Sequence, residues 1–143
     1  MKTLDIRIVS EPSATLSPEH ITEAYGAAKA FSAIAELSQE VFGVIDLDGA
    51  HHIIGTPRIV TVGLLTCNQV HPREVFAPAI AARAESIIVA HNHPSGTLEA
   101  SPEDIAMTER LVKAGRILGI EVLDHVIVSR SGYLSLRQQG VMV

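Results

Sequence analysis

Short apolar runs and longer amphipathic stretches alternate along this chain. Apolar runs of about four to eight residues, rich in β-branched side chains and bounded by turn-forming residues, are typical of strands. Longer stretches in which apolar residues recur every three or four positions are typical of helices. The apolar runs predict strands at 4–9, 41–47, 52–55, 59–66, 86–91, 122–128 and 133–136.

The amphipathic stretches predict helices that begin at Pro18, Pro72 and Pro102, because proline suits the first helical turn. The second should reach Arg83 and the third about residue 118, where Gly119 would end it. Mixed strands and helices indicate an α/β fold, a single layered domain with a central mixed β-sheet flanked by helices. The inward-facing positions of the first helix should be Ile21, Ala24, Tyr25, Ala28 and Phe31. Those of the third should be Ile105, Thr108, Leu111, Val112, Gly115 and Leu118.

The composition suits one small domain. The 143 residues are 47% hydrophobic, enough for a single sizeable core. Apolar stretches fall short of the ~20 residues that a membrane span needs, and charges at Lys2, Asp5 and Arg7 interrupt any leader-like segment, so we expect a cytoplasmic protein. Cys67 is the only cysteine, which excludes an intramolecular disulfide and favours a neutral, at least half-buried thiol.

Two histidines and an acid lie close together after the predicted strand 86–91. His91 and His93 are two residues apart and therefore share one face of an extended chain. Ser101 and Pro102 are typical of a helix start, which puts Asp104 in the first turn, where the helix dipole favours a carboxylate. Two imidazoles and one carboxylate suit zinc and leave its fourth position open for water, whose pKa the metal can lower to about 7. The sequence therefore predicts a zinc site with hydrolytic chemistry.

Simpler explanations exist for each part of this pattern. Ser101-x-x-Asp104 is also the pattern of a capping box, and an isolated His-x-His is more often packing or surface than metal-binding. The combination of both, joined by a short glycine-containing loop, favours the metal site.

The spacing His91-x-His93, seven residues, Ser101-x-x-Asp104 resembles the JAMM motif of JAB1/MPN domains. The segments 91–96 (HNHPSG), 70–75 (VHPREV) and 123–125 (LDH) resemble its RadC branch, and the likeness covers about residues 20–138 of a single domain. The resemblance implies the JAB1/MPN architecture, which is cytidine-deaminase-like, with His91, His93 and Asp104 as zinc ligands. It also implies that Ser101 helps to stabilise a tetrahedral intermediate and that a glutamate at the start of the first core strand is the general base.

Two glutamates compete for the role of base. Glu74 lies in the first turn of the predicted helix 72–83, where a contact with the helix dipole explains it. Glu40 opens the predicted strand 41–47 and follows a helix whose C-terminal dipole disfavours an acid, which indicates another use. We therefore choose Glu40 as the base, with Glu74 as a weaker candidate near the site.

The other histidines carry weaker signals. His125 begins an apolar strand and matches the RadC pattern, and the sequence leaves open whether it supports a metal ligand or only packs. We expect His51 and His52 to be exposed beside a turn, and His71 to be a helix N-terminal residue.

These features favour a zinc metallopeptidase that cuts peptide or isopeptide bonds, with a ubiquitin-like tail as one substrate that the resemblance implies. The alternative is a non-catalytic module of the RadC family, associated with DNA repair or with a protein partner. A net charge of −5 gives no general attraction to nucleic acid, and we expect no N-terminal helical extension of the kind that longer RadC-like proteins carry. A zinc nucleoside deaminase is excluded because it needs a pair of cysteines.

Overall fold

The computed structural model describes residues 4–5, 20–21, 23–63 and 70–142. These residues form a six-stranded sheet with the strand order β1-β3-β2-β4-β5-β6. The pairing of β4 with β5 is parallel and the other pairings are antiparallel, which confirms a mixed sheet. The strands are β1 (Leu4–Asp5), β2 (Val41–Leu47), β3 (Arg58–Val62), β4 (Ser86–Asn92), β5 (Glu121–Ser129) and β6 (Gly132–Ser135).

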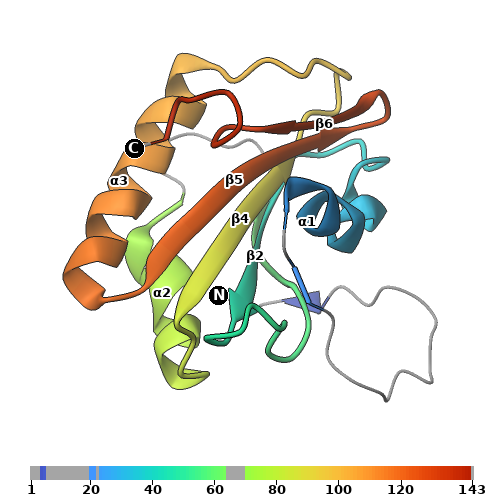
Figure 1. Ribbon diagram of the computed structural model, residues 1–143. Helices are drawn as coiled ribbons and strands as arrows, with labels where there is room; N and C mark the ends of the chain where they lie inside the picture. The colour runs from blue at the N-terminus through green and yellow to red at the C-terminus, as the bar shows by residue number, and fades with distance from the viewer. Residues whose placement is uncertain (1–3, 6–19, 22, 64–69, 143) are drawn as a thin grey trace, which may run out of the picture.

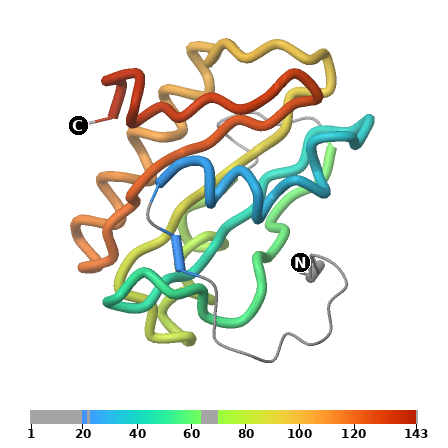
Figure 2. Tube along the Cα trace, turned by 45° about the vertical axis from the view of Figure 1, so that its right-hand side comes forward, coloured from blue at the N-terminus to red at the C-terminus, as the bar shows by residue number. Residues whose placement is uncertain are grey.

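Helices cover both faces of the sheet, which confirms the layered α/β fold (Figure 1). The helix α1 (Ala24–Ala30) and the short 3-10 helix η2 (Ser32–Ile34) lie on one face, and α2 (Pro72–Ala81) and α3 (Pro102–Leu118) lie on the other. Every residue of β2 and β4 is buried, because both faces of these strands are covered. The tube view shows α1 crossing in front of the sheet (Figure 2).

Two apolar cores follow from this layering. Successive side chains of a strand point to opposite faces, so Ile88 and Ala90 pack toward α1 while Ile87 and Val89 pack toward α2 and α3. The second of these cores, on the α3 side, is the one beside which the two histidines of the motif lie.

The helix α3 matches the sequence prediction at both ends. Ser101 is its N-cap in a capping box with Asp104, and Gly119 ends it with a left-handed φ of 78°. The predicted inward stripe was wrong at its last position, because Leu118 is 47% exposed. The chain turns back at Gly119, and Ile120 packs at Gly115, where a side chain would collide with the Ile120 carbonyl.

Some predicted elements differ in the structure. The segment 52–55 is not a strand and makes only isolated bridges, from His52 to His20 and from Ile53 to Leu47. The helix predicted from Pro18 is described only as Ala24–Ala30, and its alanine face packs on the sheet while Tyr25 is 57% exposed. Small side chains let this helix approach the sheet closely, which leaves the bulky tyrosine outside. Residues 6–9, Pro18, 64–66 and Cys67 lie outside the described residues, as do the predictions made for them.

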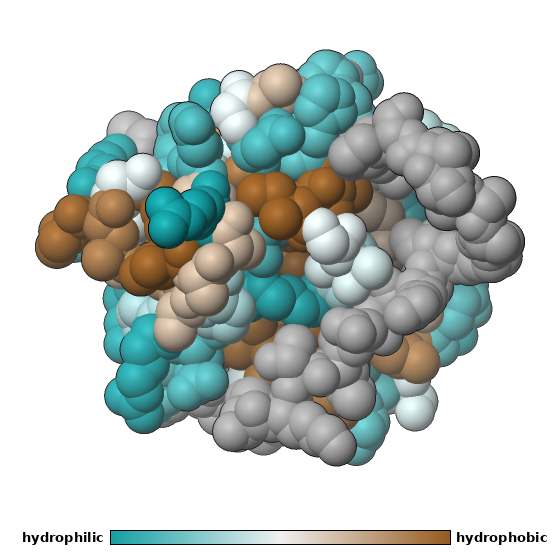
Figure 3. All heavy atoms as spheres, turned by 90° about the horizontal axis from the view of Figure 1, so that it is seen from below, coloured by the Kyte–Doolittle hydropathy of each residue, from teal (hydrophilic) through white to brown (hydrophobic). Residues whose placement is uncertain are grey.

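The described surface carries large apolar side chains from several different elements. From below, apolar side chains are interspersed with polar ones (Figure 3). None of the helices formed by the described residues is long and apolar enough to cross a membrane. The exposed large apolar residues are Tyr25, Leu37, Val62, Ile80, Ile117, Leu118 and Tyr133.

Candidate metal centre

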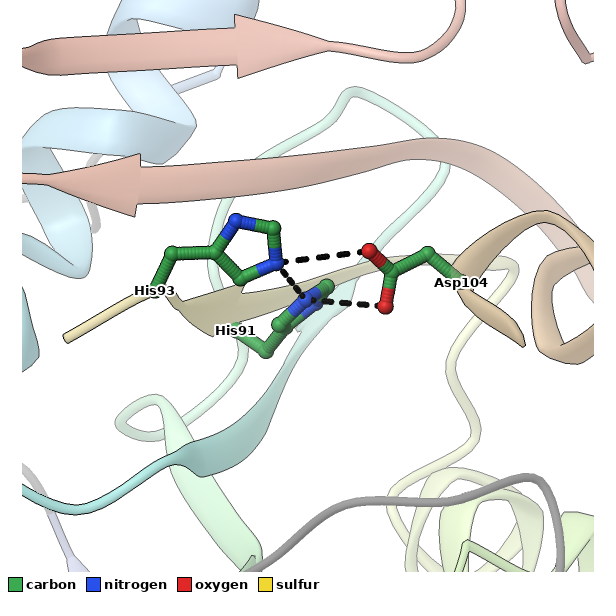
Figure 4. Close-up of side chains that lie close together, drawn as sticks. All are labelled: His91, His93 and Asp104. Atoms are coloured by element: carbon green, nitrogen blue, oxygen red, sulfur yellow. Dashed lines mark hydrogen bonds and ion pairs between the residues drawn. The ribbon is translucent and has the colours of Figure 1, made fainter. Parts of the chain in front are cut away.

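The two histidines of the motif lie at the end of the central strand β4. His91 belongs to the strand, and His93 extends the ladder by donating its backbone N–H to the Val128 carbonyl at 3.0 Å. Their spacing of two residues places both rings on the same side, as the sequence predicted, with the Nε2 atoms 3.0 Å apart (Figure 4). His91 is buried and His93 is partly exposed, so the pair sits at the rim of the core.

Asp104 reaches the same point from the first turn of α3. Its Oδ1 lies 3.2 Å from His91 Nε2 and its Oδ2 lies 3.3 Å from His93 Nε2 (Figure 4). The capping box aims this carboxylate, because the Ser101 backbone N–H donates to Asp104 Oδ2 at 2.9 Å and the Asp104 N–H donates to Ser101 Oγ at 3.1 Å. The cap and the metal-binding arrangement therefore use the same residues together.

The three side chains have the composition and spacing of a metal site. His91, His93 and Asp104 each offer one ligand atom, all within 4.8 Å of one another. A tetrahedral zinc ion with bonds of about 2.0–2.1 Å needs ligand atoms about 3.3 Å apart, close to the 3.0–3.3 Å found here. Two imidazoles and one carboxylate thus fit a divalent metal that keeps an open position.

Burial and hydrogen bonds shift the pKa values of this group. Burial would raise the pKa of the Asp104 carboxyl, but hydrogen bonds from His91 and His93 outweigh burial and hold that pKa well below its usual range. The hydrogen bond to Asp104 raises the pKa of His93 above 6.5 against the opposing effect of burial, and the charge of Glu40 contributes. The metal-free group therefore binds a proton that a metal ion would displace.

His125 lies directly behind His91. Its Nε2 is 2.8 Å from His91 Nδ1, and its Nδ1 is 2.6 Å from the Thr108 hydroxyl. The His125 ring is completely buried, with Phe42 edge-on at 5.8 Å between ring centroids. Burial holds the pKa of His125 well below its ordinary value, and the charge of His91 acts in the same direction. Of the two roles left open by the sequence, the contacts favour support of His91.

His93 has a different support. Its Nδ1 is 2.9 Å from the Thr97 carbonyl, within the loop that joins β4 to α3. The Ser131 hydroxyl donates to the Gly96 carbonyl at 2.7 Å, which anchors this loop on the turn between β5 and β6. The loop between the ligands is thus held by hydrogen bonds at Gly96 and Thr97, and by the capping box where it enters α3.

Glu40 lies near the group, at the start of β2. In the antiparallel pairing of β2 with β4, Phe42 is opposite His91, which brings the residues before β2 beside the end of β4. The side chain of Asn92 accepts from the Val41 N–H at 2.6 Å and donates to the Gln39 carbonyl at 2.9 Å. Asn92 therefore forms hydrogen bonds with the backbone on both sides of Glu40.

The contacts described for the remaining candidates are with other residues. Glu74 is in the first turn of α2, with its carboxylate 3.8 Å from Arg73. His71 is the N-cap of α2, as predicted. His52 Nδ1 is 3.5 Å from Asp48, and both side chains are exposed. Sequence reasoning gave no role to Asn92; an amide in an otherwise apolar buried strand was the available signal, since such a group must find partners.

This arrangement, a mixed sheet with a His-His-Asp group at the end of its central strand, is that of a JAB domain. The family model described as the RadC-like JAB domain matches residues 19–141, and the chain belongs to that family. The resemblance seen in the sequence is thereby confirmed.

Curated relatives are similar to most of this chain. A UPF0758 protein of Rubrobacter xylanophilus is 51% identical over 109 residues, 76% of this chain and 47% of the relative. A UPF0758 protein of Methanospirillum hungatei is 46% identical over 134 residues, 94% of this chain and 55% of the relative. One of Thermotoga maritima is 45% identical over 123 residues, 86% of this chain and 55% of the relative. The chain spans about half the length of the curated relatives it matches.

Proposed function

We propose that this domain is a zinc-dependent hydrolase of the JAMM type that cleaves peptide or isopeptide bonds. The observation that supports it most is the convergence of two imidazole Nε2 atoms and one carboxylate within hydrogen-bonding distance. Zinc held by His91, His93 and Asp104 would supply Lewis-acid chemistry, activating a water molecule and polarising the carbonyl that it attacks.

Glu40 is the general base in this proposal. Its negative charge acts on His93, so its carboxylate lies within electrostatic reach of the site. It takes a proton from the attacking water and returns it to the leaving nitrogen. The partly buried position at the start of β2 suits a group that must meet both solvent and substrate.

Ser101 stabilises the developing oxyanion. In the capping box its Oγ accepts a hydrogen bond from the Asp104 N–H. A hydroxyl that accepts in this way still has its own proton to donate. That proton can be aimed at the oxygen of a scissile carbonyl, where one such donor is worth about 10²–10³ in rate.

The substrate class follows from this chemistry. A polarised carbonyl, a base that returns a proton to nitrogen and an oxyanion donor suit an amide or isopeptide bond. A flexible ubiquitin-like tail is one such substrate. The cytoplasmic location stays a prediction from the sequence.

Peptide and isopeptide libraries test the activity. Zinc-loaded protein should cleave members of these libraries, and Glu40→Gln should abolish cleavage while it keeps its zinc. Glu74→Gln is the matched control, because it changes an acid that contacts Arg73 instead of the metal group, and it should keep full activity. Zinc-loaded protein that leaves every library member intact would count against the hydrolase; salt-dependent DNA binding by Asp104→Ala would then favour the non-catalytic module.

A further inference from the structure

We propose that Thr108 and His125 are positioning residues that keep a hydrogen on Nδ1 of His91, so that Nε2 is the ring nitrogen that a metal would take. The proposal rests on the metal site of the proposed function, and does not need the peptidase activity. It assigns a purpose to a completely buried histidine that is not one of the three candidate ligands.

The contacts form a chain from the Asp104 backbone carbonyl through Thr108 and His125 to His91. The hydrogen atoms can be placed from the carbonyl end, where the acceptor is known. The Thr108 hydroxyl lies 2.7 Å from the Asp104 backbone carbonyl, which can only accept. Two oxygens this close need a proton between them, so the single hydroxyl proton of Thr108 points at Asp104. Threonine in a helix commonly donates to the carbonyl four residues earlier.

The orientation of His125 follows. With its proton committed, the Thr108 oxygen can only accept from His125, whose Nδ1 is 2.6 Å away and must carry the hydrogen. A second ring proton would place a charged imidazolium in a completely buried position beside Phe42, where it would lose its hydration. The Nε2 of His125 is therefore a bare acceptor.

The orientation of His91 is the last step. Its Nδ1 lies 2.8 Å from the bare Nε2 of His125 and so donates its hydrogen there. The ring nitrogen that remains for a metal is therefore Nε2, on the side that faces His93 and Asp104. The reverse order would leave two acceptors in contact at 2.7 Å, the Thr108 oxygen and the Asp104 backbone carbonyl, and would leave Nδ1 of His91 without its hydrogen.

The two histidine ligands thus have different supports. His93 uses the Thr97 carbonyl, the usual partner of a metal-binding histidine. His91 uses a chain of two side chains that ends on the backbone of the third ligand, Asp104. The chain links one ligand to another, so it also fixes the distance between β4 and α3 at the site.

Thr108→Val tests this chain, with Thr108→Ser as its matched control. Valine keeps the shape and removes the hydroxyl, whereas serine keeps the hydroxyl. Without that acceptor, His125 can turn its hydrogen toward His91 and move the His91 proton to Nε2. We expect Thr108→Val to weaken Zn²⁺ affinity about 10–100-fold, in competition with a chromophoric chelator, and Thr108→Ser to stay within about twofold of the parent.

Nitrogen NMR of the metal-free parent gives a readout that a merely packing role would not move. The ¹⁵N shifts should show His91 protonated at Nδ1, and His125 protonated at Nδ1 and bare at Nε2. A His91 ring that is bare at Nδ1 overturns the proposal, even if Thr108→Val does not fold. So does a folded Thr108→Val protein that binds Zn²⁺ as tightly as Thr108→Ser. Absent cleavage with the predicted zinc affinities would overturn the peptidase proposal alone.

Discussion

At the scale of single residues, Asp104 belongs to two arrangements at once. It completes the capping box of α3 and also faces both histidines. The sequence offered these as competing explanations of one motif, and the structure shows that the cap aims the carboxylate. The three candidate ligands were predictable because they lie within residues 91–104. The sequence left the role of His125 open, because its link to His91 joins residues 34 positions apart.

Zinc affinity should fall as pH falls through the raised pKa of His93. The metal binds the neutral ring, and the hydrogen bond with Asp104 holds the proton on His93 above pH 6.5. Affinity should therefore rise with pH until His93 has lost its proton and then level off. Chelator competition between pH 6 and pH 8 measures this, and a flat profile over that range would show that no such proton is displaced.

At the scale of elements, the end of β4 organises the site through its two faces. His91 faces α3, while the neighbouring Asn92 faces the chain that leads into β2. The strand 41–47 and the helix 102–118 were predicted with the observed bounds, because long apolar or amphipathic patterns decide them. The strand predicted at 52–55 does not form. Strand pairing beyond a turn depends on the partner strand, and His51 in that turn has a left-handed φ of 66°.

Asn92→Ala should reduce activity without loss of zinc. It leaves the buried Val41 N–H without its partner, which costs about 1–3 kcal/mol of unfolding free energy, and it frees the chain around Glu40. Ser86→Ala in the same strand is the control, because the Ser86 hydroxyl is buried without a hydrogen-bond partner. Urea unfolding, zinc content and cleavage rate should separate the two variants. Loss of zinc in Asn92→Ala would contradict the assignment of metal binding to the His91 face of β4 and of Glu40 positioning to the Asn92 face.

At the scale of the molecule, the sheet brings together segments that are distant in the sequence. Three segments meet at one rim of the two cores: the start of β2 with Glu40, the end of β4 with the two histidines, and the first turn of α3 with Asp104. The layered class was predictable from the alternation of elements, whereas the strand order was not, because it depends on contacts between cores. Because zinc would link β4 to α3, its binding should stabilise the whole domain against unfolding.

Zinc should raise the temperature of unfolding. At a free concentration about 100 times the dissociation constant, binding to the folded state adds about 2.7 kcal/mol, which is roughly 5–10 °C for a domain of this size. Scanning calorimetry with zinc and with a chelator measures the difference. Asp104→Ala should show no shift; an equal shift in that variant would place the metal elsewhere.

The most direct test of the metal centre is the zinc content of tag-free protein by mass spectrometry, with Asp104→Ala beside it. The account predicts one zinc per chain in the parent and none in the variant, because His91 and His93 alone are an incomplete ligand set. No zinc in either protein, or equal zinc in both, would contradict it.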